Sequence, residues 1–281
     1  MILKDAFTEG IRKLKLSNID APVVTAGAIL CYVLGCEKTY LYSHDEYLLS
    51  KDEYENYCEF LKRRIEGEPL QYITGCQEFM SLNFNVCREV LIPRQDTEIL
   101  VESVLEYVGQ RDNVSILDIG TGSGCIAISL AYYGKNTQVM GVDISKGALE
   151  IARLNARNCG VEENTVFVES NLFENIPPKK FDIIISNPPY IPIEVIETLD
   201  KQVKDFEPTI ALGGGEDGLD FYRRITEQSG SFLKPKGLLV FEVGFDQAQK
   251  VMKIMESSFE NIKVQKDLAG IERVVMGNLS K

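Results

Sequence analysis

Residues 181–190 read Phe181-Asp182-Ile183-Ile184-Ile185-Ser186-Asn187-Pro188-Pro189-Tyr190. The apolar run has no polar alternation, which predicts a strand buried on both faces, and the prolines end it because they cannot donate to a ladder. Carbonyl oxygens, the Asn187 amide and an aromatic ring then lie at the strand end, where open α/β sheets bind ligands. Such groups suit a planar ligand group that carries an NH2. A plain strand-to-loop turn explains the same residues, so both interpretations stay open at this point.

The chain before this stretch alternates strand, turn and helix. An apolar strand is predicted at 114–119, a glycine turn at 120–124, a helix at 125–133 and a second strand at 138–142, which ends at Asp143. Because this alternation is typical of βαβ units, we predict an α/β fold with a parallel sheet and helices on both faces.

The glycine turn reads Gly120-Thr121-Gly122-Ser123-Gly124, which is G-x-G-x-G and not the G-x-G-x-x-G of dinucleotide-binding proteins. Its glycines let the backbone approach a ligand closely, and Asp143 is placed to accept hydrogen bonds from ribose hydroxyls. A glycine turn alone is weak support for a cofactor site. The acidic residue about twenty positions farther along strengthens that prediction.

The later segments extend the sheet. A helix at 146–158 and a strand at 165–169 lead to Asn171 and Leu172, which we expect at the same sheet edge as Asp143. A long loop at 205–218 follows the opening stretch. Further strands are predicted at 237–243, 262–265 and 273–276, the last two as an antiparallel pair. The strand ends should therefore converge on one crevice.

The chain is predicted to have three parts: a small helical bundle at 1–68, a β-hairpin linker at 69–92 and the α/β domain at 93–281. In the bundle, Asp20 is the expected N-cap of an apolar helix that begins at Pro22, and Ser50 followed by Glu53 predicts a capping box.

The linker region has a β-like pattern. We interpret Gln71-Tyr72-Ile73-Thr74-Gly75 as part of it, and Leu82-Asn83-Phe84-Asn85-Val86 alternates strictly. Beyond it, Asp96 or Thr97 is expected to cap a helix that extends to Val108. Arg94 precedes that helix and is either a solvated charge or a group that orients a carboxylate near a cofactor.

The composition limits the functions to consider. The net charge is −12, from 42 acidic and 30 basic residues, and lacks the basic excess of a nucleic-acid binder. The seven cysteines form no C-x-x-C pair and His44 is the sole histidine, so neither a zinc site nor a disulfide framework is predicted. We expect reduced thiols in a cytoplasmic protein, with no segment that spans a membrane.

Taken together, these motifs resemble a known family. The segment Asp118-Ile119-Gly120-Thr121-Gly122-Ser123-Gly124, Asp143 and Asn187-Pro188-Pro189-Tyr190 are similar to those of class I S-adenosylmethionine-dependent methyltransferases. The helical bundle, Leu91-Ile92-Pro93-Arg94-Gln95-Asp96-Thr97-Glu98 and Phe206-Glu207-Pro208 narrow the resemblance to the release-factor glutamine methyltransferases, PrmC/HemK. The resemblance implies a Rossmann-like sheet and covers nearly the whole chain. Gln95 departs from a usual proline and Asn171 from a common aspartate.

The resemblance implies methyl transfer from S-adenosyl-L-methionine to the side-chain amide nitrogen of the glutamine in the Gly-Gly-Gln motif of class I peptide chain release factors. The product would be S-adenosyl-L-homocysteine. Asn187 and Pro188 would be catalytic, and the substrate would contact residues 187–190. The expected cofactor-binding residues are Gly120, Thr121, Gly122, Ser123, Gly124, Asp143, Asn171, Leu172 and Asn187, with Arg94 and Thr97 as candidate supporting residues. No metal, membrane or direct nucleic-acid partner is expected, and the protein is expected to be a monomer.

Two alternatives stay open. An enzyme that methylates exocyclic amines of nucleic acids, adenine N6 or guanine N2, would use the same Asn-Pro-Pro-Tyr residues on a flipped base, although the charge of −12 opposes it. A nucleotide-binding module without enzymatic activity would leave the acceptors at Asn187 without a task.

Overall fold

The computed structural model describes residues 1–280, which form two compact units. One unit is Met1–Cys76 together with Lys201–Phe206, and the other is Gln77–Asp200 together with Glu207–Lys281. The short segment at 201–206 therefore belongs with the N-terminal helices, although it lies far from them in the sequence.

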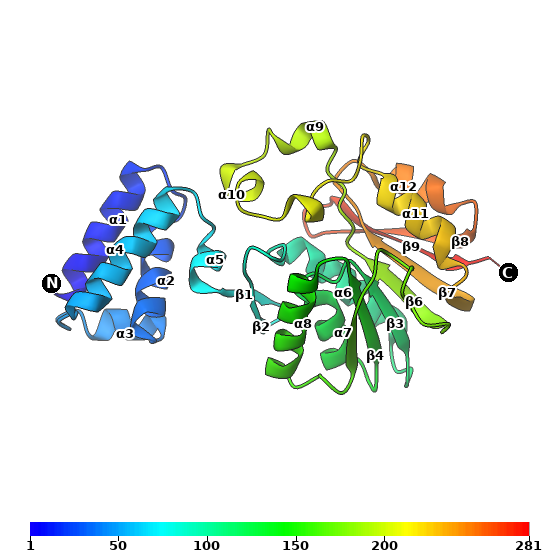
Figure 1. The fold of residues 1–281 in the computed structure, drawn as a ribbon, viewed down its shortest axis with the longest axis horizontal. Coiled ribbons are helices and arrows are strands. Elements are labelled where there is room, and N and C mark those ends of the chain that lie inside the picture. The colour runs from blue at the N-terminus through cyan, green and yellow to red at the C-terminus, as the bar shows by residue number, and fades with distance from the viewer. Residues whose placement is uncertain (281) are drawn as a thin grey trace. The chain divides into compact units, whose positions relative to one another are not determined.

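The N-terminal unit is helical, as predicted (Figure 1). Its helices are α1 (Leu3–Leu16), α2 (Pro22–Leu34), α3 (Lys38–Ser43), α4 (Lys51–Ile65), α5 (Leu70–Thr74) and α10 (Lys201–Lys204). The apolar faces of α1, α2 and α4 bury a common core that includes Leu14, Ile29 and Leu61. The predicted capping box is confirmed, because Ser50 accepts from the Glu53 N–H and Glu53 accepts from the Ser50 N–H.

Two local predictions in this unit are wrong. Asp20 does not cap α2, which begins after Ala21 in a left-handed conformation without a side-chain cap. Residues 71–75 are not β-like, because 71–74 belong to α5 and Gly75 directly follows it. Pro69 accepts the first backbone hydrogen bonds of this helix, and Gly75 ends it at φ 71°. The β-branched and aromatic side chains of this segment favour a strand. The segment is helical instead, with Pro69 at the start of the helix and Gly75 at its end.

A hairpin follows, as predicted. Strands β1 (Cys76–Phe79) and β2 (Leu82–Asn85) pair with each other, and both turn residues between them, Met80 and Ser81, have positive φ. Positive φ at both positions is the geometry of a tight hairpin turn. The Met80 N–H donates to a carboxylate oxygen of Glu98 at 2.7 Å, which fixes the turn against the next helix.

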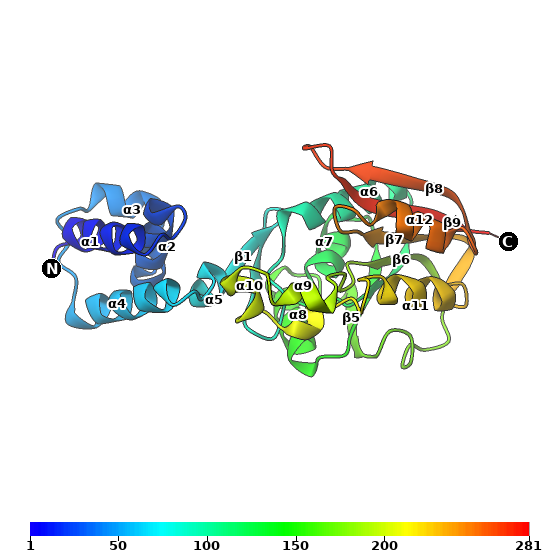
Figure 2. The same cartoon turned by 90° about the horizontal axis from the view of Figure 1, so that it is seen from above.

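The larger unit is built on a mixed sheet of seven strands in the order β5-β4-β3-β6-β7-β9-β8. These strands are β3 (Ser115–Ile119), β4 (Gln138–Asp143), β5 (Thr165–Glu169), β6 (Phe181–Ser186), β7 (Leu233–Glu242), β8 (Phe259–Lys266) and β9 (Glu272–Leu279). The first five strands in that order are parallel. Strand β9 runs antiparallel to both β7 and β8, and β8 lies at the edge of the sheet (Figure 2). Every predicted strand of this sheet is present, and β7, β8 and β9 are longer than predicted.

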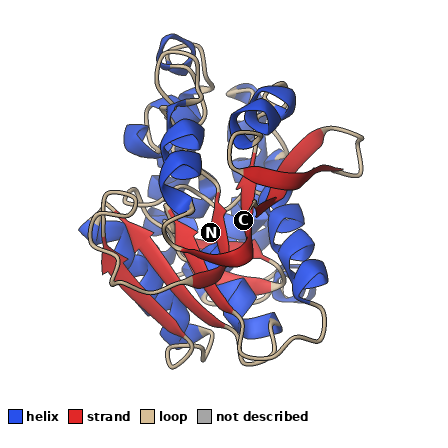
Figure 3. Cartoon of the chain, turned by 90° about the vertical axis from the view of Figure 1, so that its right-hand side faces the viewer, coloured by secondary structure: helices blue, strands red, loops and turns tan. Residues whose placement is uncertain are grey.

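Helices cover both faces of the sheet (Figure 3). They are α6 (Glu98–Val108), α7 (Cys125–Tyr133) and α8 (Lys146–Asn158) on one face, and α11 (Asp220–Ser229) and α12 (Ala248–Met255) on the other. Along β6, Ile183 and Ile185 join the first core while Ile184 joins the second. Because successive side chains of a strand alternate between faces, the unbroken apolar run of β6 reflects burial on both sides.

The start of α6 differs from the prediction. A 3₁₀ turn, Gln95–Thr97, leads into the helix, and Thr97 is itself helical and makes no side-chain cap. The Thr97 hydroxyl is therefore available for a hydrogen bond outside the start of α6. Short helical turns α9 (Ile193–Ile196) and η2 (Thr209–Ala211) lie in the long connection between β6 and α11.

Candidate functional site

A cavity of about 300 Å³ lies at the carboxyl ends of the parallel strands. Its wall brings together most of the residues predicted from the strand ends, namely Gly120, Gly122, Asp143, Asn171, Leu172, Asn187, Pro188 and Pro189. Thr121, Ser123, Gly124, Tyr190, Arg94 and Thr97 do not line it. The predicted convergence of strand ends is thus observed.

The glycines of the turn have different structural roles. All three have positive φ, 74° at Gly120, 54° at Gly122 and 81° at Gly124. A Cβ at Gly120 or Gly122 would meet no atom within 4 Å, so these two leave open space toward the cavity. At Gly124 a Cβ would lie 2.8 Å from Ile128 Cδ1, so this glycine permits packing instead. The first two therefore form a bare backbone cradle that a ligand can approach.

Asp143 is held rigidly at the tip of β4. Its Oδ2 accepts from the Gly122 N–H and its Oδ1 from the Ser145 N–H, each at 2.9 Å. Each carboxylate oxygen retains a second lone pair. A carboxylate fixed in this way can accept two hydroxyl groups of a ribose without reordering.

Asp118 lies beneath the turn and is completely buried. Its Oδ2 accepts from the Thr121 hydroxyl at 2.6 Å, while its Oδ1 has no partner among residues 1–280. Burial raises the pKa of Asp118 to about 7, with the nearby Asp143 charge adding to the rise. Thr121 therefore acts through this buried contact and not on the cavity wall.

Asn171 and Leu172 close another side of the cavity. The Asn171 amide donates to Glu174 at 2.8 Å, and its oxygen accepts from Arg224 at 3.3 Å. Leu172 is buried, with φ 52°, and supplies an apolar surface. A flat apolar wall beside an amide suits an aromatic base.

Asn187 follows directly after β6. Its Nδ2 donates to the Thr97 hydroxyl at 3.2 Å. Because that contact occupies the nitrogen end of the amide, the Asn187 oxygen is available to a ligand, and Pro188 lines the same cavity. The pairing of these two residues as acceptors for a substrate amide stays a prediction.

Arg94 is paired with a carboxylate. It donates to both oxygens of Glu207, at 2.6 and 2.7 Å, and the Glu207 side chain is only 2% exposed. Burial raises the pKa of Glu207 while the Arg94 charge lowers it. Sequence reasoning did not identify this partner, because no local pattern links two residues so far apart. The pair anchors the loop that places Pro208 on the cavity wall.

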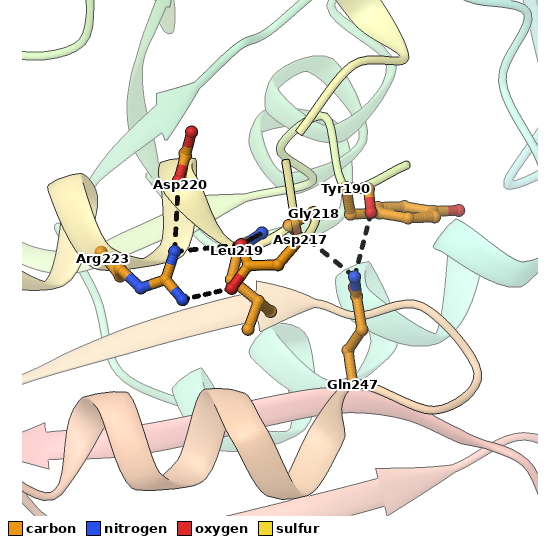
Figure 4. Close-up of polar contacts among 7 residues, drawn as sticks. All are labelled: Tyr190, Asp217, Gly218, Leu219, Asp220, Arg223 and Gln247. Carbon is orange, nitrogen blue, oxygen red and sulfur yellow. Dashed lines mark hydrogen bonds and ion pairs between the residues drawn. The ribbon is translucent and has the colours of Figure 1, made fainter. Parts of the chain in front are cut away.

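Tyr190 is half-buried against the core beneath α11 and α12. Burial raises the pKa of its hydroxyl to about 12. Its backbone oxygen accepts from Gln247 at 2.9 Å, and the same amide group reaches the Gly218 oxygen at 3.4 Å (Figure 4). Gln247 was not predicted from the sequence. It joins the Asn-Pro-Pro-Tyr turn to the glycine-rich loop.

Three further features of residues 1–280 bear on function. No group of three or more His, Cys, Asp or Glu side chains is arranged to hold a metal ion. All seven cysteines are free thiols. Within the same residues, no helix has the length and apolar character needed to cross a membrane.

Comparison with known proteins gives consistent results. Residues 5–75 match the family described as PrmC N-terminal domain, and residues 95–202 match the Methyltransferase small domain. The release factor glutamine methyltransferase of Clostridium acetobutylicum is 41% identical over 279 residues, covering 98% of each protein. That of Koribacter versatilis is 43% identical over 278 residues, covering 99% of this chain and 98% of the other. The hMettl16 catalytic domain, solved in complex with MAT2A 3'UTR hairpin 6, has the same fold, with a TM-score of 0.59, 13% identity and 83% of each chain covered.

Proposed function

The chain belongs to the release factor glutamine methyltransferase family, and we propose that it methylates the side-chain amide nitrogen (N5) of the glutamine in the Gly-Gly-Gln motif of class I peptide chain release factors. Its sheet is the Rossmann-like sheet of class I methyltransferases. The observation that carries the proposal is that the wall of one cavity contains Asp143 together with Asn187 and Pro188. A methyl donor and an amide substrate can therefore meet in it.

The residues present fit S-adenosylmethionine. The bare backbone at Gly120 and Gly122 leaves room for the amino-acid part of the cofactor, and the fixed Asp143 carboxylate would accept the ribose hydroxyls. Leu172 would pack on the adenine, with Asn171 at its edge. Ser123 and Gly124 support the turn, and Thr121 anchors it on Asp118. When bound, the cofactor supplies an electrophilic methyl group and leaves as S-adenosylhomocysteine.

The acceptors match the chemistry of an amide nucleophile. An amide nitrogen is weakly nucleophilic because its lone pair is delocalised, and it becomes positive as it attacks. The Asn187 oxygen and the Pro188 carbonyl would hold its two N–H groups, aim the nitrogen at the methyl group and stabilise the developing charge. The alkylated amide is strongly acidic and loses its proton to water, so no strong general base is required. Pro189 and Tyr190 would shape the rest of the substrate site.

We propose separate roles for the parts of the chain. Residues 1–68 would dock the release factor, residues 69–92 would link, and residues 93–281 would bind the cofactor and perform catalysis. The helical region is acidic, which suits a basic partner that itself binds the ribosome.

Mass spectrometry of a purified class I release factor, incubated with the enzyme and S-adenosylmethionine, tests the proposal directly. The expected result is one added methyl group on the glutamine of the Gly-Gly-Gln peptide. Asn187→Ala serves as the comparison, and its turnover should fall roughly 100-fold, far more than its affinity for the cofactor. An unmodified release factor, with methylated adenine or guanine in a parallel nucleic-acid reaction, would favour the alternative function instead.

A further inference from the structure

The orientation of the Asn187 amide determines whether the proposed site works. An amide presents an acceptor at one end and two donors at the other, and a rotation of 180° exchanges them. If the nitrogen faced the cavity, it would meet the N–H groups of the substrate amide, and two sets of donors would oppose each other. Some part of the protein must therefore hold the oxygen toward the cavity.

Thr97 is the first residue that holds it. The hydroxyl lies 3.2 Å from Asn187 Nδ2, and the Thr97 residue is 2% exposed. Because Thr97 is already helical and does not cap α6, its hydroxyl has no competing role at the helix start. A hydroxyl can donate as well as accept, however, so Thr97 alone would tolerate either orientation of the amide.

Glu242 removes that ambiguity. In the parallel pairing of β6 with β7, Ser186 lies opposite Phe241, so Asn187 and Glu242 are the next residues on adjacent strands. The Glu242 carboxylate therefore faces the Thr97 hydroxyl and the Asn187 amide, and hydrogen bonding to these two groups lowers its pKa against the larger rise that burial causes. Above its pKa the Glu242 carboxyl is ionised, and an ionised carboxylate only accepts. Thr97 must then donate to Glu242 and accept from Asn187, which must present its NH2 group to both.

We propose that Glu242, together with Thr97, is a positioning residue that holds the Asn187 oxygen toward the substrate amide. This inference rests on the proposed function, in which Asn187 is the acceptor for that amide. It extends the function by naming the residues that set its direction.

The burial of Glu242 supports a functional role. The residue is 3% exposed, and its Oε2 has no hydrogen-bond partner among residues 1–280. A buried carboxylate with an unsatisfied oxygen destabilises a fold, and well-packed apolar residues usually do better at such positions. The nearby Arg273 compensates only in part, because it also pairs with Asp96 at 2.6 Å and Asp267 at 3.0 Å. Stability alone therefore gives no reason for a glutamate here.

The test compares Glu242→Gln, Thr97→Val and Thr97→Ser with the control Thr226→Val. The assays are run at pH 8, above the pKa of Glu242. Glutamine has the shape of glutamate but can present an NH2 group to Asn187, which favours rotation of the Asn187 amide. We expect kcat to fall about 10- to 100-fold in Glu242→Gln and Thr97→Val, with the KM for S-adenosylmethionine within twofold of wild type. Thr97→Ser keeps the hydroxyl and should restore most of kcat. Thr226 is buried with an unpartnered hydroxyl away from the cavity wall, so Thr226→Val should behave as wild type.

A second measurement does not depend on activity. The side-chain amide NMR signals of Asn187, assigned with Asn187→Ser, should shift in Glu242→Gln and Thr97→Val and stay unchanged in Thr226→Val. An unchanged kcat and unchanged Asn187 signals in folded Glu242→Gln would overturn the inference. If the wild-type enzyme is inactive on release factors, the proposed function is wrong. The NMR comparison would still show whether Glu242 orients Asn187.

Discussion

At the scale of single residues, Asp143 is the residue most directly expected to bind the cofactor, because two backbone N–H groups fix the position of its carboxylate. Asp143→Ala should lower the affinity for S-adenosylmethionine about 10- to 100-fold, since hydrogen bonds to a charged acceptor contribute about 1.5–3 kcal/mol. Isothermal titration calorimetry measures this. Asp246→Ala removes an exposed carboxylate that does not line the cavity and is the matched control. Equal affinities in the two variants would remove Asp143 from the binding site.

The buried carboxylates predict how stability depends on pH. Burial raises the pKa of Glu242 from an ordinary 4.5 to about 7. Between these values the folded state keeps a proton that the unfolded state has released, so the free energy of unfolding falls as pH rises from about 4.5 to 7 and then levels. The loss is on the order of 3 kcal/mol for Glu242. Urea titrations of wild type and Glu242→Gln at pH 5, 6, 7 and 8 should give a shallower pH dependence for the variant. Parallel curves would show that Glu242 has an ordinary pKa.

At the scale of elements, periodicity and composition predicted the strands of the sheet and the helices between them. Burial on both faces explains that success, because an unbroken apolar run such as Ile183–Ile185 is typical of a strand that is covered on both sides. The wrong predictions concern the ends of helices and one short helix, where the conformation depends on a few local interactions. The start of α2, the helix at 70–74 and the uncapped Thr97 depend on single residues with special dihedrals or on distant partners.

Gln247 provides a test at this scale, since it ties the Asn-Pro-Pro-Tyr turn to the glycine-rich loop (Figure 4). Gln247→Leu leaves the Tyr190 and Gly218 carbonyl oxygens without this donor and should destabilise the fold by about 2–3 kcal/mol. Urea unfolding measures the change. Arg223→Gln is the comparison, because it breaks a pair with Asp217 in which both side chains are about half exposed, and it should cost less than about 1 kcal/mol. Similar costs in both variants would show that Gln247 does not anchor the turn.

At the scale of the whole molecule, the sequence predicted which strand ends meet and most of their residues that line the cavity, but not the distant contacts that hold them in place. Convergence follows from the topology of a parallel sheet, which fixes Asp143 and Asn187 on one edge. Arg94 and Glu207 lie more than ninety positions apart in the sequence, and Thr97 and Asn187 lie ninety positions apart. Such contacts depend on how loops pack, and no periodic pattern encodes them.

The docking role proposed for residues 1–68 is best tested in the intact chain, because removing these residues would strip Lys201–Phe206 of the unit with which it packs. Replacing the exposed carboxylates Asp52, Glu55 and Glu59 of α4 by their amides should lower kcat/KM on an intact release factor several-fold and weaken its dependence on salt, because fewer charges would steer association. Activity on a short Gly-Gly-Gln peptide should not change. The matched control replaces Glu162, Glu163 and Glu256, which are exposed carboxylates of the larger unit, and alters the net charge equally. If both triple variants lose the same activity on the intact factor, the effect comes from total charge and α4 is not part of the docking surface.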